Sequence, residues 1–507
     1  MLAKVLSSTL LGVDAWMIEV EVDLANGLPV FTTVGLPDAS IRESRDRVKA
    51  AMANSGFPFP LKRITVNLAP AHVRKEGTAF DLPIALGLLQ ASGYIQSDRL
   101  HKYLVVGELS LDGRVKAVTG AMPMALALRQ GAAEGMIVPA DNAAEAAVIE
   151  DVPVFGVATL AQAIGFVNGT ESIPRTPCHV QTLFRQQAVY QEDFADVRGQ
   201  QHVKRALEVA AAGAHNVLLV GPPGSGKSLL ARRLPSILPD MSLEEAIETS
   251  KIHSIAGFLN REQALVATRP FRAPHHSTSD AGLIGGGTIP APGEVSLAHN
   301  GVLFLDELPE FRRSVLEVLR QPLEEAQVTI ARAAMTLTFP ARFMLAAAMN
   351  PCPCGFATDP QHTCTCATQH IQRYKARISG PLLDRIDIHV EVPPVRYAEL
   401  TSTATAESSA TIRTRVNAAR AVQRTRFAGT SLPHNAAMGV RDLRRHCGLD
   451  SAGERLLEQA MRHYGLSARA HDRIRKVART IADLAGAEAI GVEHLSEAIQ
   501  YRTLDRQ

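Results

Sequence analysis

An eight-residue segment with spaced glycines and a lysine has the pattern of a phosphate-binding loop. Gly221-Pro222-Pro223-Gly224-Ser225-Gly226-Lys227-Ser228 fills every position of G-x-x-x-x-G-K-[ST]. The glycines let backbone N–H groups turn inward around a polyphosphate, Lys227 supplies charge for the outer phosphates, and the Ser228 hydroxyl is placed to hold Mg²⁺. The segment predicts binding of a nucleoside triphosphate. The expected nucleotide-binding residues are Gly221, Gly224, Ser225, Gly226, Lys227, Ser228 and, through the metal, Asp306.

Asp306 and Glu307 follow an apolar run, Gly301-Val302-Leu303-Phe304-Leu305, that is short enough for a buried strand of a parallel sheet. A carboxylate at the tip of such a strand can coordinate Mg²⁺, so we expect Asp306 to share the metal with Ser228. Glu307 is the better candidate to orient or deprotonate the attacking water. An Asp-Glu pair at a strand end is common by itself, but downstream of a phosphate loop it predicts nucleotide hydrolysis.

Four of the six cysteines lie close together as C-x-C, nine residues, C-x-C: Cys352, Cys354, Cys364 and Cys366. Four thiolates on one short loop suit tetrahedral Zn²⁺ in a structural site. His362 is a possible replacement ligand, and four reduced thiols without metal are the competing interpretation. Because the loop joins Asn350 to Arg385, we expect a metal here to act on that segment more than on nucleotide binding at Lys227.

Regular elements must position these groups. His215–Val220 is typical of a buried strand and Ser228–Arg233 of a helix, one on each side of the phosphate loop. Earlier in the chain, Ile64–Leu68 and Tyr103–Gly107 resemble strands, and Leu82–Leu89 between them resembles a helix. Three later segments have helical patterns: Val416–Phe427, Glu454–His463 and Arg473–Leu484.

The 507 residues predict several domains, because single domains are usually much shorter. We expect an α/β domain at 1–168, a proline-containing linker at 169–192, an α/β motor core at 193–394 with the cysteine insertion at 352–366, and a helical domain at 395–507. A Ser/Thr/Ala-rich stretch, Thr401–Thr411, marks the last junction.

The charge distribution is more informative than the net charge of +2. From Arg413 to Thr480, 15 Lys and Arg stand against 5 Asp and Glu. This segment could bind a polyanion, or it could be an Arg-rich helical surface that faces acidic neighbours. The first residues lead into a strand pattern rather than a signal peptide, and no apolar run reaches membrane-spanning length. With the clustered cysteines, this predicts a cytoplasmic protein without a membrane partner.

The motor core resembles AAA+ ATPases. Asp196-Val197-Arg198-Gly199-Gln200 resembles the segment that lies against adenine, and Asn350 matches the first sensor residue, near the γ-phosphate. Gly380-Pro381-Leu382-Leu383-Asp384-Arg385-Ile386-Asp387 resembles the arginine-finger segment of the magnesium-chelatase and MCM branch. Ser467-Ala468-Arg469-Ala470-His471-Asp472-Arg473 resembles its second sensor, with Arg469 the first choice. An arginine supplied in trans implies a ring.

Two further segments resemble the channel loops of the same branch. They are Gly285–Glu294 and the hairpin that begins after Leu323-Glu324-Glu325 and includes Val328–Ala333. In that branch such loops face the central pore, which would make Arg332 a nucleic-acid contact. An Arg on a solvated hairpin is the alternative.

The first domain resembles the Lon-type protease domain, with its ribosomal S5 domain 2-like α/β fold. Gly107-Glu108-Leu109-Ser110-Leu111-Asp112-Gly113-Arg114-Val115 is similar to a strand-turn segment of that family. Ala79 stands where the family has its serine nucleophile, and Met122 stands where it has its lysine base. Neither side chain can act as nucleophile or base, so a non-proteolytic role is left.

The whole chain resembles the YifB/ComM group of magnesium-chelatase-like AAA+ proteins. The resemblance implies a Lon-like α/β domain without the catalytic dyad, a P-loop α/β motor with a parallel sheet, and a C-terminal helical lid. It also implies a homohexameric ATP- and Mg²⁺-dependent DNA motor, or helicase, that promotes branch migration on single-stranded or branched DNA in natural transformation and homologous recombination. A chelatase-type motor that remodels a partner protein and needs no nucleic acid is the alternative.

Overall fold

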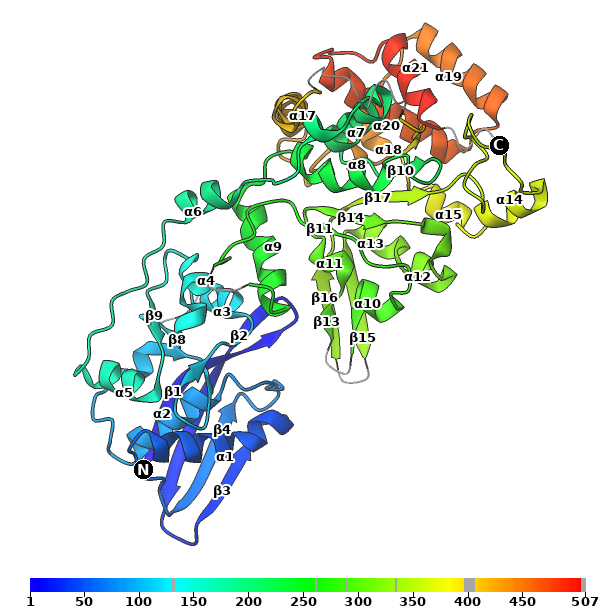
Figure 1. Cartoon of the computed structure of the whole chain (residues 1–507). Coiled ribbons are helices and arrows are strands. Elements are labelled where there is room, and N and C mark those ends of the chain that lie inside the picture. Colours follow the sequence, from blue (N-terminus) through cyan, green and yellow to red (C-terminus); the bar gives the residue numbers. More distant parts are fainter. Residues whose placement is uncertain are drawn as a thin grey trace. The chain divides into compact units, whose positions relative to one another are not determined.

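The computed structural model describes residues 1–129, 131, 133–259, 262–287, 290–332, 335–395 and 406–502 (Figure 1). Backbone contacts divide the chain into two units. The first comprises Met1–Ala188 and Leu243–Ala267, and the second comprises Val189–Ser242 and Thr268–Gln507. Each unit has its own hydrophobic core.

Within the described residues, the first unit is built on a seven-stranded mixed sheet with the order β3-β4-β2-β1-β5-β8-β9. The long hairpin β1–β2 is antiparallel, and β5 continues the sheet in parallel beside β1. From Ile18 on, residues of β2 alternate between buried and half-buried, as expected for a strand with one face on the core. The strands are β1 (Leu2–Leu11), β2 (Asp14–Ala25), β3 (Val30–Val34), β4 (Arg63–Ala69), β5 (Tyr103–Val105), β8 (Gly135–Pro139) and β9 (Val154–Val157), with a small hairpin, β6 (Glu108–Leu109) and β7 (Val115–Lys116).

Of the helices described in the first unit, the four α-helices that lie between Asp81 and Asn168 contact strands of this sheet. The helix α2 (Asp81–Ala91) is almost wholly buried because it contacts both β1 and β2. The others are α1 (Ala39–Asn54), α3 (Ala121–Leu128), α4 (Ala143–Ala147), α5 (Leu160–Asn168), α6 (Val180–Gln187) and α9 (Leu243–Ile255). The strands expected at Ile64–Leu68 and Tyr103–Gly107 and the helix between them are confirmed as β4, β5 and α2, with β5 ending at Val105.

Two segments differ from the expected division. The helix α9 lies inside the range expected for the motor core, yet it packs on α3, and its Ser254 hydroxyl donates to the buried Glu145 carboxylate of α4. The structure therefore assigns Leu243–Ala267 to the first unit. The expected linker 169–192 contains the helix α6, of which only Val180 is buried. The other domain boundaries stay predictions.

In the part of the chain that the structure describes, the second unit has a five-stranded, all-parallel sheet with the order β11-β14-β17-β10-β18. The strands are β10 (Val217–Val220), β11 (Phe271–Arg272), β14 (Val302–Leu305), β17 (Met344–Met349) and β18 (Ile388–Glu391). β10 and β14 confirm the strands expected from the two apolar runs. Because the strands are parallel, the segments that follow β10, β14 and β17 meet at one edge of the sheet.

Helices and two hairpins surround this sheet. The helices are α7 (Gln201–Gly213), α8 (Lys227–Arg233), α10 (Asp280–Ile284), α11 (Glu294–Leu297), α12 (Arg313–Val318), α13 (Arg320–Glu325), α14 (Thr368–Lys375) and α15 (Gly380–Leu383). The hairpins are β12 (Gly285–Gly286) with β13 (Ala291–Pro292), and β15 (Gln327–Arg332) with β16 (Met335–Pro340).

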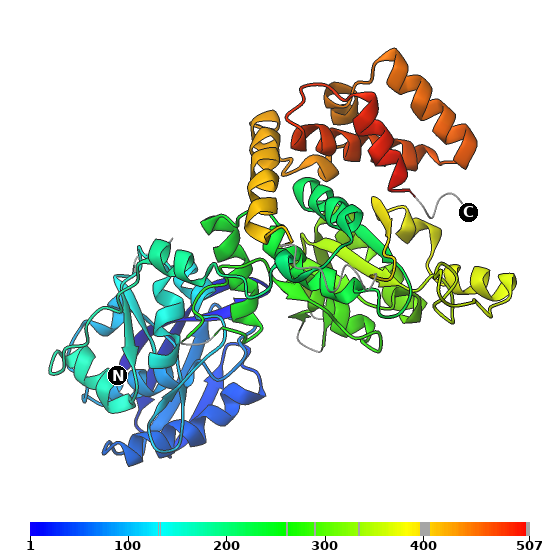
Figure 2. The ribbon, with the colours of Figure 1, turned by 45° about the horizontal axis from the view of Figure 1, so that its top comes forward.

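The C-terminal region is helical, as expected (Figure 2). It consists of α17 (Ser409–Arg426), α18 (Val440–His446), α19 (Ser451–Tyr464), α20 (Ala468–Leu484) and α21 (Val492–Gln500). α17 and α20 both contact α7, so these helices share one core with the parallel sheet. Among the helices the structure describes, none combines the length and the hydrophobicity that crossing a membrane would require.

Candidate active site

The phosphate-loop segment connects β10 to α8 at the carboxyl-terminal edge of the sheet. Gly224 and Gly226 have φ angles of +76° and +89°, which glycine adopts without the penalty that a side chain would bring. The expected adenine segment also contacts this loop, because Gln200 Nε2 donates to Ser225 O at 2.8 Å. The loop is therefore held by its own glycines and by the segment before α7.

Lys227 is buried within the loop, with its ammonium directed at oxygen acceptors. Its Nζ donates to Gly221 O and Pro222 O, both at 2.8 Å, and to Asn350 Oδ1 at 3.2 Å. Burial lowers the pKa of Lys227, against the opposing effect of the nearby Asp306 and Glu307 carboxylates. A polyphosphate in the loop would give this partly desolvated ammonium a stronger partner than neutral carbonyls.

Ser228 and Asp306 come together from two neighbouring elements. The Ser228 hydroxyl donates to Asp306 Oδ2 at 2.6 Å, and Asp306 lies directly after β14. Hydroxyl and carboxylate oxygens are the ligands that Mg²⁺ prefers. The donor set therefore fits the expected magnesium ion.

Glu307 follows Asp306 in a left-handed backbone conformation, with φ of +53°. Such a conformation costs free energy for a residue with a side chain and occurs often at functional sites. The carboxylate is 55% exposed, so water can reach it, and its Oε2 lies 3.4 Å from Nδ1 of His276. The position suits a group that handles a water molecule.

Sequence reasoning missed His276. The segment that carries it follows β11, which has only two residues and pairs in parallel with β14. The ring of His276 lies tilted against that of His275, with 4.0 Å between centroids, and contacts Phe311 edge-on. The consecutive histidines were the available signal, but a two-residue strand gives too short a pattern to place them beside Glu307.

Arg385 is not brought to the phosphate loop of its own chain. β18 runs parallel to β10, with Val217 opposite Ile388 and Val220 opposite Glu391. Arg385 precedes β18 and the loop follows β10, so they lie at opposite edges, separated by the length of a four-residue strand, about 13 Å. Asn216 Nδ2 donates to Arg385 O at 2.8 Å, which fixes Arg385 beside the start of β10.

The Arg385 guanidinium pairs with Glu324, and its side chain is largely buried. Burial lowers its pKa, and so does the positive charge of Arg320, Arg469 and Arg473. Arg469, the expected second sensor, is exposed and pairs with Asp384 at 2.9 Å, so it shares this edge of the sheet. Both expected arginines therefore lie at the sheet edge opposite the phosphate loop of the same chain.

The helix α20 contacts the Arg385 segment at a second place. Arg473 pairs with the buried Asp387, which also accepts from Nδ1 of His215 at 3.1 Å. Burial raises the pKa of Asp387, but Arg473 and His215 outweigh it, and the pKa lies well below its usual range. This network links the helical region to the start of β10.

The four clustered cysteines are brought together. Their Sγ atoms all lie within 4.8 Å of one another, and Cys352 is buried. The Cys352–Cys354, Cys352–Cys364 and Cys354–Cys364 Sγ distances are 3.3, 3.7 and 3.6 Å. A tetrahedral Zn²⁺ with Zn–S bonds of about 2.3 Å has sulfur–sulfur edges of about 3.8 Å, so the donor set fits zinc.

The thiols of the cluster do not titrate alike: burial and the neighbouring Cys354 and Cys352 raise the pKa of Cys364 to about 12 and also raise that of Cys366, so the surroundings favour thiolate at Cys354 and not at these two. The Phe356 backbone N–H, together with Cys352 and the Thr365 N–H, lowers the pKa of Cys354 to about 6. His362 is engaged elsewhere: its Nδ1 lies 2.9 Å from Asp359 Oδ2, and its ring packs against Phe356. Among the described residues, the group that could hold a metal contains the cysteines and not His362.

The two expected channel loops lie side by side. Arg332 Nε donates to Gly287 O at 3.3 Å, and a Cβ on Gly286 would lie 3.2 Å from Arg332 Nη2. A Cβ on Gly285 would lie 2.8 Å from Ile330 Cδ1. Thr288, Ile289 and Ala333 of these segments lie outside the described residues.

In the first unit, Ala79 and Met122, the two positions that match a protease dyad, both make hydrogen bonds through their backbone atoms within the fold. Ala79 O accepts from Gly107 N at 2.9 Å, next to the strand-turn segment. Met122 is fully buried at the start of α3, and its N–H donates to Glu145 at 3.0 Å.

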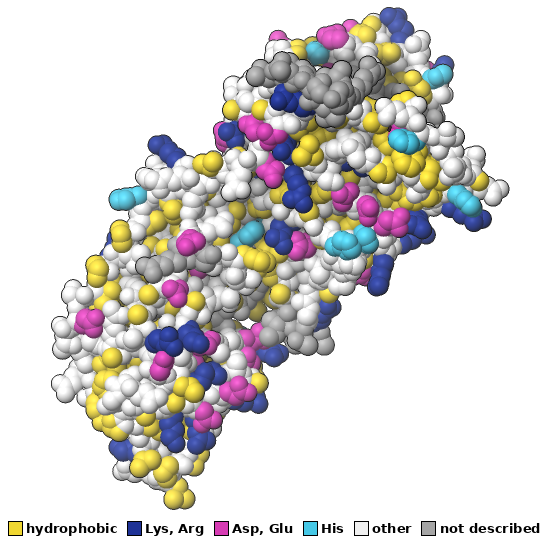
Figure 3. Space-filling model, in the orientation of Figure 1, with side chains coloured by type: hydrophobic (Ala, Val, Ile, Leu, Met, Phe, Trp, Pro, Cys, Tyr) yellow, Lys and Arg dark blue, Asp and Glu magenta, His cyan; other side chains and the backbone are white. Residues whose placement is uncertain are grey.

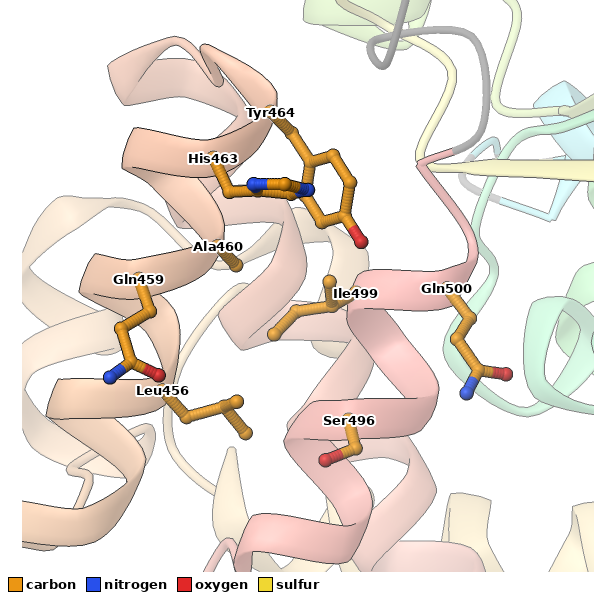
Figure 4. Close-up of a pocket in the computed structure, with 8 residues that line it drawn as sticks. All are labelled: Leu456, Gln459, Ala460, His463, Tyr464, Ser496, Ile499 and Gln500. Carbon is orange, nitrogen blue, oxygen red and sulfur yellow. The ribbon is translucent and has the colours of Figure 1, made fainter.

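A separate pocket of about 650 Å³ lies between α19 and α21 in the helical region (Figure 4). Its lining is mostly apolar and amide side chains, with the His463 ring packed against Tyr464. It contains none of the expected site residues.

Family models of a magnesium-chelatase subunit match the chain in three segments. Residues 193–400 match the model described as magnesium chelatase, subunit ChlI; residues 20–142 match subunit ChlI of Mg-chelatase; and residues 406–502 match its C-terminal model. The chain is 46% identical to competence protein ComM of Haemophilus influenzae, over 100% of this chain and 98% of that protein. It is 45% identical to YifB of Escherichia coli, over 98% of this chain and 96% of that protein. It is 23% identical to the chloroplastic magnesium-chelatase subunit ChlI of Oryza sativa subsp. indica, over 41% and 50%.

Proposed function

Because the chain belongs to the YifB/ComM family of magnesium-chelatase-like AAA ATPases, we propose that it is a hexameric, ATP-dependent DNA motor. The motor would promote branch migration during natural transformation and homologous recombination in the cytoplasm. The resemblance to a competence protein supports this proposal. The alternative is a motor that remodels a partner protein, as the resemblance to the chelatase subunit suggests.

The observation that carries the proposal is the position of Arg385 at the sheet edge opposite the phosphate loop. A guanidinium that stabilises charge on a transferring phosphoryl group must lie beside that group. Here the Arg385 of a neighbouring subunit would fill this role, and Arg469 would join it as second sensor. Asn350, which contacts Lys227, would act as first sensor, and Glu307 would activate water.

The paired hairpins support a nucleic-acid substrate. Arg332 lies where the two expected channel loops meet, so one guanidinium could serve both loops as a phosphate contact. On the face shown in Figure 3, acidic and basic side chains are interspersed. The basic excess of Arg413–Thr480 is partly neutralised, because Arg415 and Arg426 pair with Glu208 and Asp483. The hairpins therefore support DNA binding better than the segment charge does.

The decisive experiment measures the ATPase rate with no DNA, with single-stranded DNA and with forked DNA at several salt concentrations. A DNA motor should be stimulated, and its DNA affinity should fall steeply with salt because phosphate contacts release counterions. Arg332→Ala should lower the stimulated increment relative to its own DNA-free rate. Arg129→Ala, at an exposed Arg paired with Asp151, is the matched control. No stimulation and no salt-dependent binding would favour the protein-remodelling alternative.

We further propose that the first unit has a Lon-protease-like, ribosomal S5 domain 2-like fold and acts as a non-proteolytic scaffold. Ala79 and Met122 support this role, since neither can supply a nucleophile or a base. We also propose that the cysteine cluster holds a structural Zn²⁺, supported by its sulfur–sulfur distances. Metal analysis of protein purified without chelator should find about one zinc per chain, because one tetrahedral site needs all four thiolates.

A further inference from the structure

The cysteine loop and the phosphate loop touch. Strand β17 leads into the cysteine loop and pairs with β10, which leads into the phosphate loop. Where the two strands end, Gly221 N donates to Met349 O at 3.2 Å, and the next residue, Asn350, accepts from Lys227. The chain then turns at Cys352, where Gly355 N donates to Cys352 O at 3.0 Å. At this turn Gly355 packs against Pro223, so closely that a Cβ on Gly355 would lie 2.5 Å from Pro223 Cδ and 2.7 Å from its Cγ.

Neither partner in this contact can easily give way. Pro223 is part of the phosphate loop, and its ring fixes its own φ, so displacing the ring displaces the loop. Gly355 has φ of +89° and follows Cys354 directly. Its position therefore depends on where the cysteine Sγ atoms are held, and Cys352 anchors the start of the turn in the core.

We propose that the four-cysteine loop positions the phosphate loop, with Gly355 as the positioning residue, and that a metal on the cysteines strengthens nucleotide binding. The inference rests on the proposed nucleotide and zinc sites. It departs from the expectation that a metal here acts on the segment toward Arg385 more than on nucleotide binding at Lys227. The reason is that the cysteine loop contacts the phosphate loop directly, through Gly355 and Pro223.

The test is a double-mutant cycle on affinity for a fluorescent ADP analogue with excess Mg²⁺. Gly355→Ala should weaken binding about tenfold, because the new Cβ overlaps a rigid ring and the phosphate loop must shift. Pro223→Ala removes the atoms that would overlap, so the double variant should recover most of the affinity lost in Gly355→Ala. Additive effects would overturn the inference, because contacting residues should be coupled.

The control for backbone strain is Gly429→Ala. Gly429 has φ of +79°, close to that of Gly355, and nothing lies within 4 Å of a Cβ built there. It should lose stability but not nucleotide affinity. If Gly429→Ala weakens binding as much as Gly355→Ala, the strain explanation replaces positioning and the inference fails.

A second arm removes the metal with a zinc-selective chelator and follows zinc content and nucleotide affinity together. Affinity should fall several-fold on zinc loss and return on zinc addition, in the wild type and in Gly429→Ala. Zinc loss without a change in affinity would overturn the inference and leave the zinc site standing. If the purified protein contains no zinc, the zinc site and the metal part of the inference are refuted. The double-mutant cycle would then still test whether Gly355 positions the phosphate loop through Pro223. A wild type that binds no nucleotide would instead refute the proposed function.

Discussion

Two residues at the same edge of the parallel sheet should be separable by function. Lys227 is buried among carbonyl oxygens and Asn350, where it can meet a polyphosphate. Glu307 is exposed to water on a strained turn. Binding and hydrolysis should therefore respond differently when each is changed.

Lys227→Ala should abolish detectable nucleotide binding, because it removes the one cation that the phosphate loop itself supplies. Glu307→Gln should bind ATP with nearly unchanged affinity and hydrolyse it about 10²–10³-fold more slowly, since it loses the group that activates water. Equilibrium binding and steady-state turnover measure the two effects. Turnover at the wild-type rate in Glu307→Gln would remove Glu307 from the mechanism.

His276 should act through Glu307. Its Nδ1 lies 3.4 Å from the carboxylate, so it can orient Glu307 without touching the nucleotide. His276→Ala should lower kcat several-fold and leave nucleotide affinity unchanged, as expected for lost orientation rather than lost binding. The matched control is His275→Ala, whose Nδ1 instead lies 2.8 Å from the Ser277 hydroxyl. Equal losses in both variants would point to a structural role of the histidine pair.

At the scale of elements, the sequence predicted the two buried parallel strands and the phosphate loop, because both have a fixed residue pattern. The apolar runs before Gly221 and Asp306 identified β10 and β14, because a central parallel strand must be apolar on both faces. The sequence could not predict that α9 belongs to the first unit, because the residue pattern of a helix does not specify which surface it packs on. It also could not place Gly355 against Pro223, since nothing in the spacing of the cysteines specifies what their loop touches.

Strand β18 carries a buried histidine with a consequence for stability. Neither ring nitrogen of His389 has a hydrogen-bond partner within the described part of the chain. Burial, together with the positive charge of Arg502, lowers the pKa of His389 to about 3. An unfolded histidine has a pKa of about 6.5, so below that pH the unfolded chain binds a proton that the folded protein does not.

The free energy of unfolding should therefore fall as the pH drops from about 6.5 toward 3, by up to about 1.4 kcal/mol per pH unit from His389. His389→Phe should reduce this slope. His434, which is half-buried and whose pKa its surroundings lower well below the usual range, should keep part of the slope in the variant. Urea unfolding monitored by circular dichroism between pH 7 and pH 5 measures how the free energy of unfolding depends on pH. An unchanged slope in His389→Phe would show that His389 takes up a proton in the folded state.

At the scale of the whole molecule, one chain holds the two halves of a hydrolytic site at opposite edges of its sheet. The phosphate loop, Asp306 and Glu307 lie at one edge, and Arg385 and Arg469 lie at the other. A cyclic assembly with head-to-tail contacts brings these two edges together at every interface. Activity should then belong to the interface and not to the subunit.

Subunit mixing tests this directly. Arg385→Ala and Lys227→Ala should each be nearly inactive alone, because every interface in either ring lacks one half of the site. In a ring mixed at equal amounts, about a quarter of the interfaces join an intact loop to an intact arginine, so activity should return. Glu324→Gln removes the ion-pair partner of Arg385 but keeps the arginine. It therefore shows whether activity is lost with the ion pair or with the guanidinium that acts on the neighbouring site. Arg385→Lys keeps the charge if Arg385→Ala fails to fold. Full activity in Arg385→Ala, or a mixture no more active than its components, would mean that each subunit completes its own site.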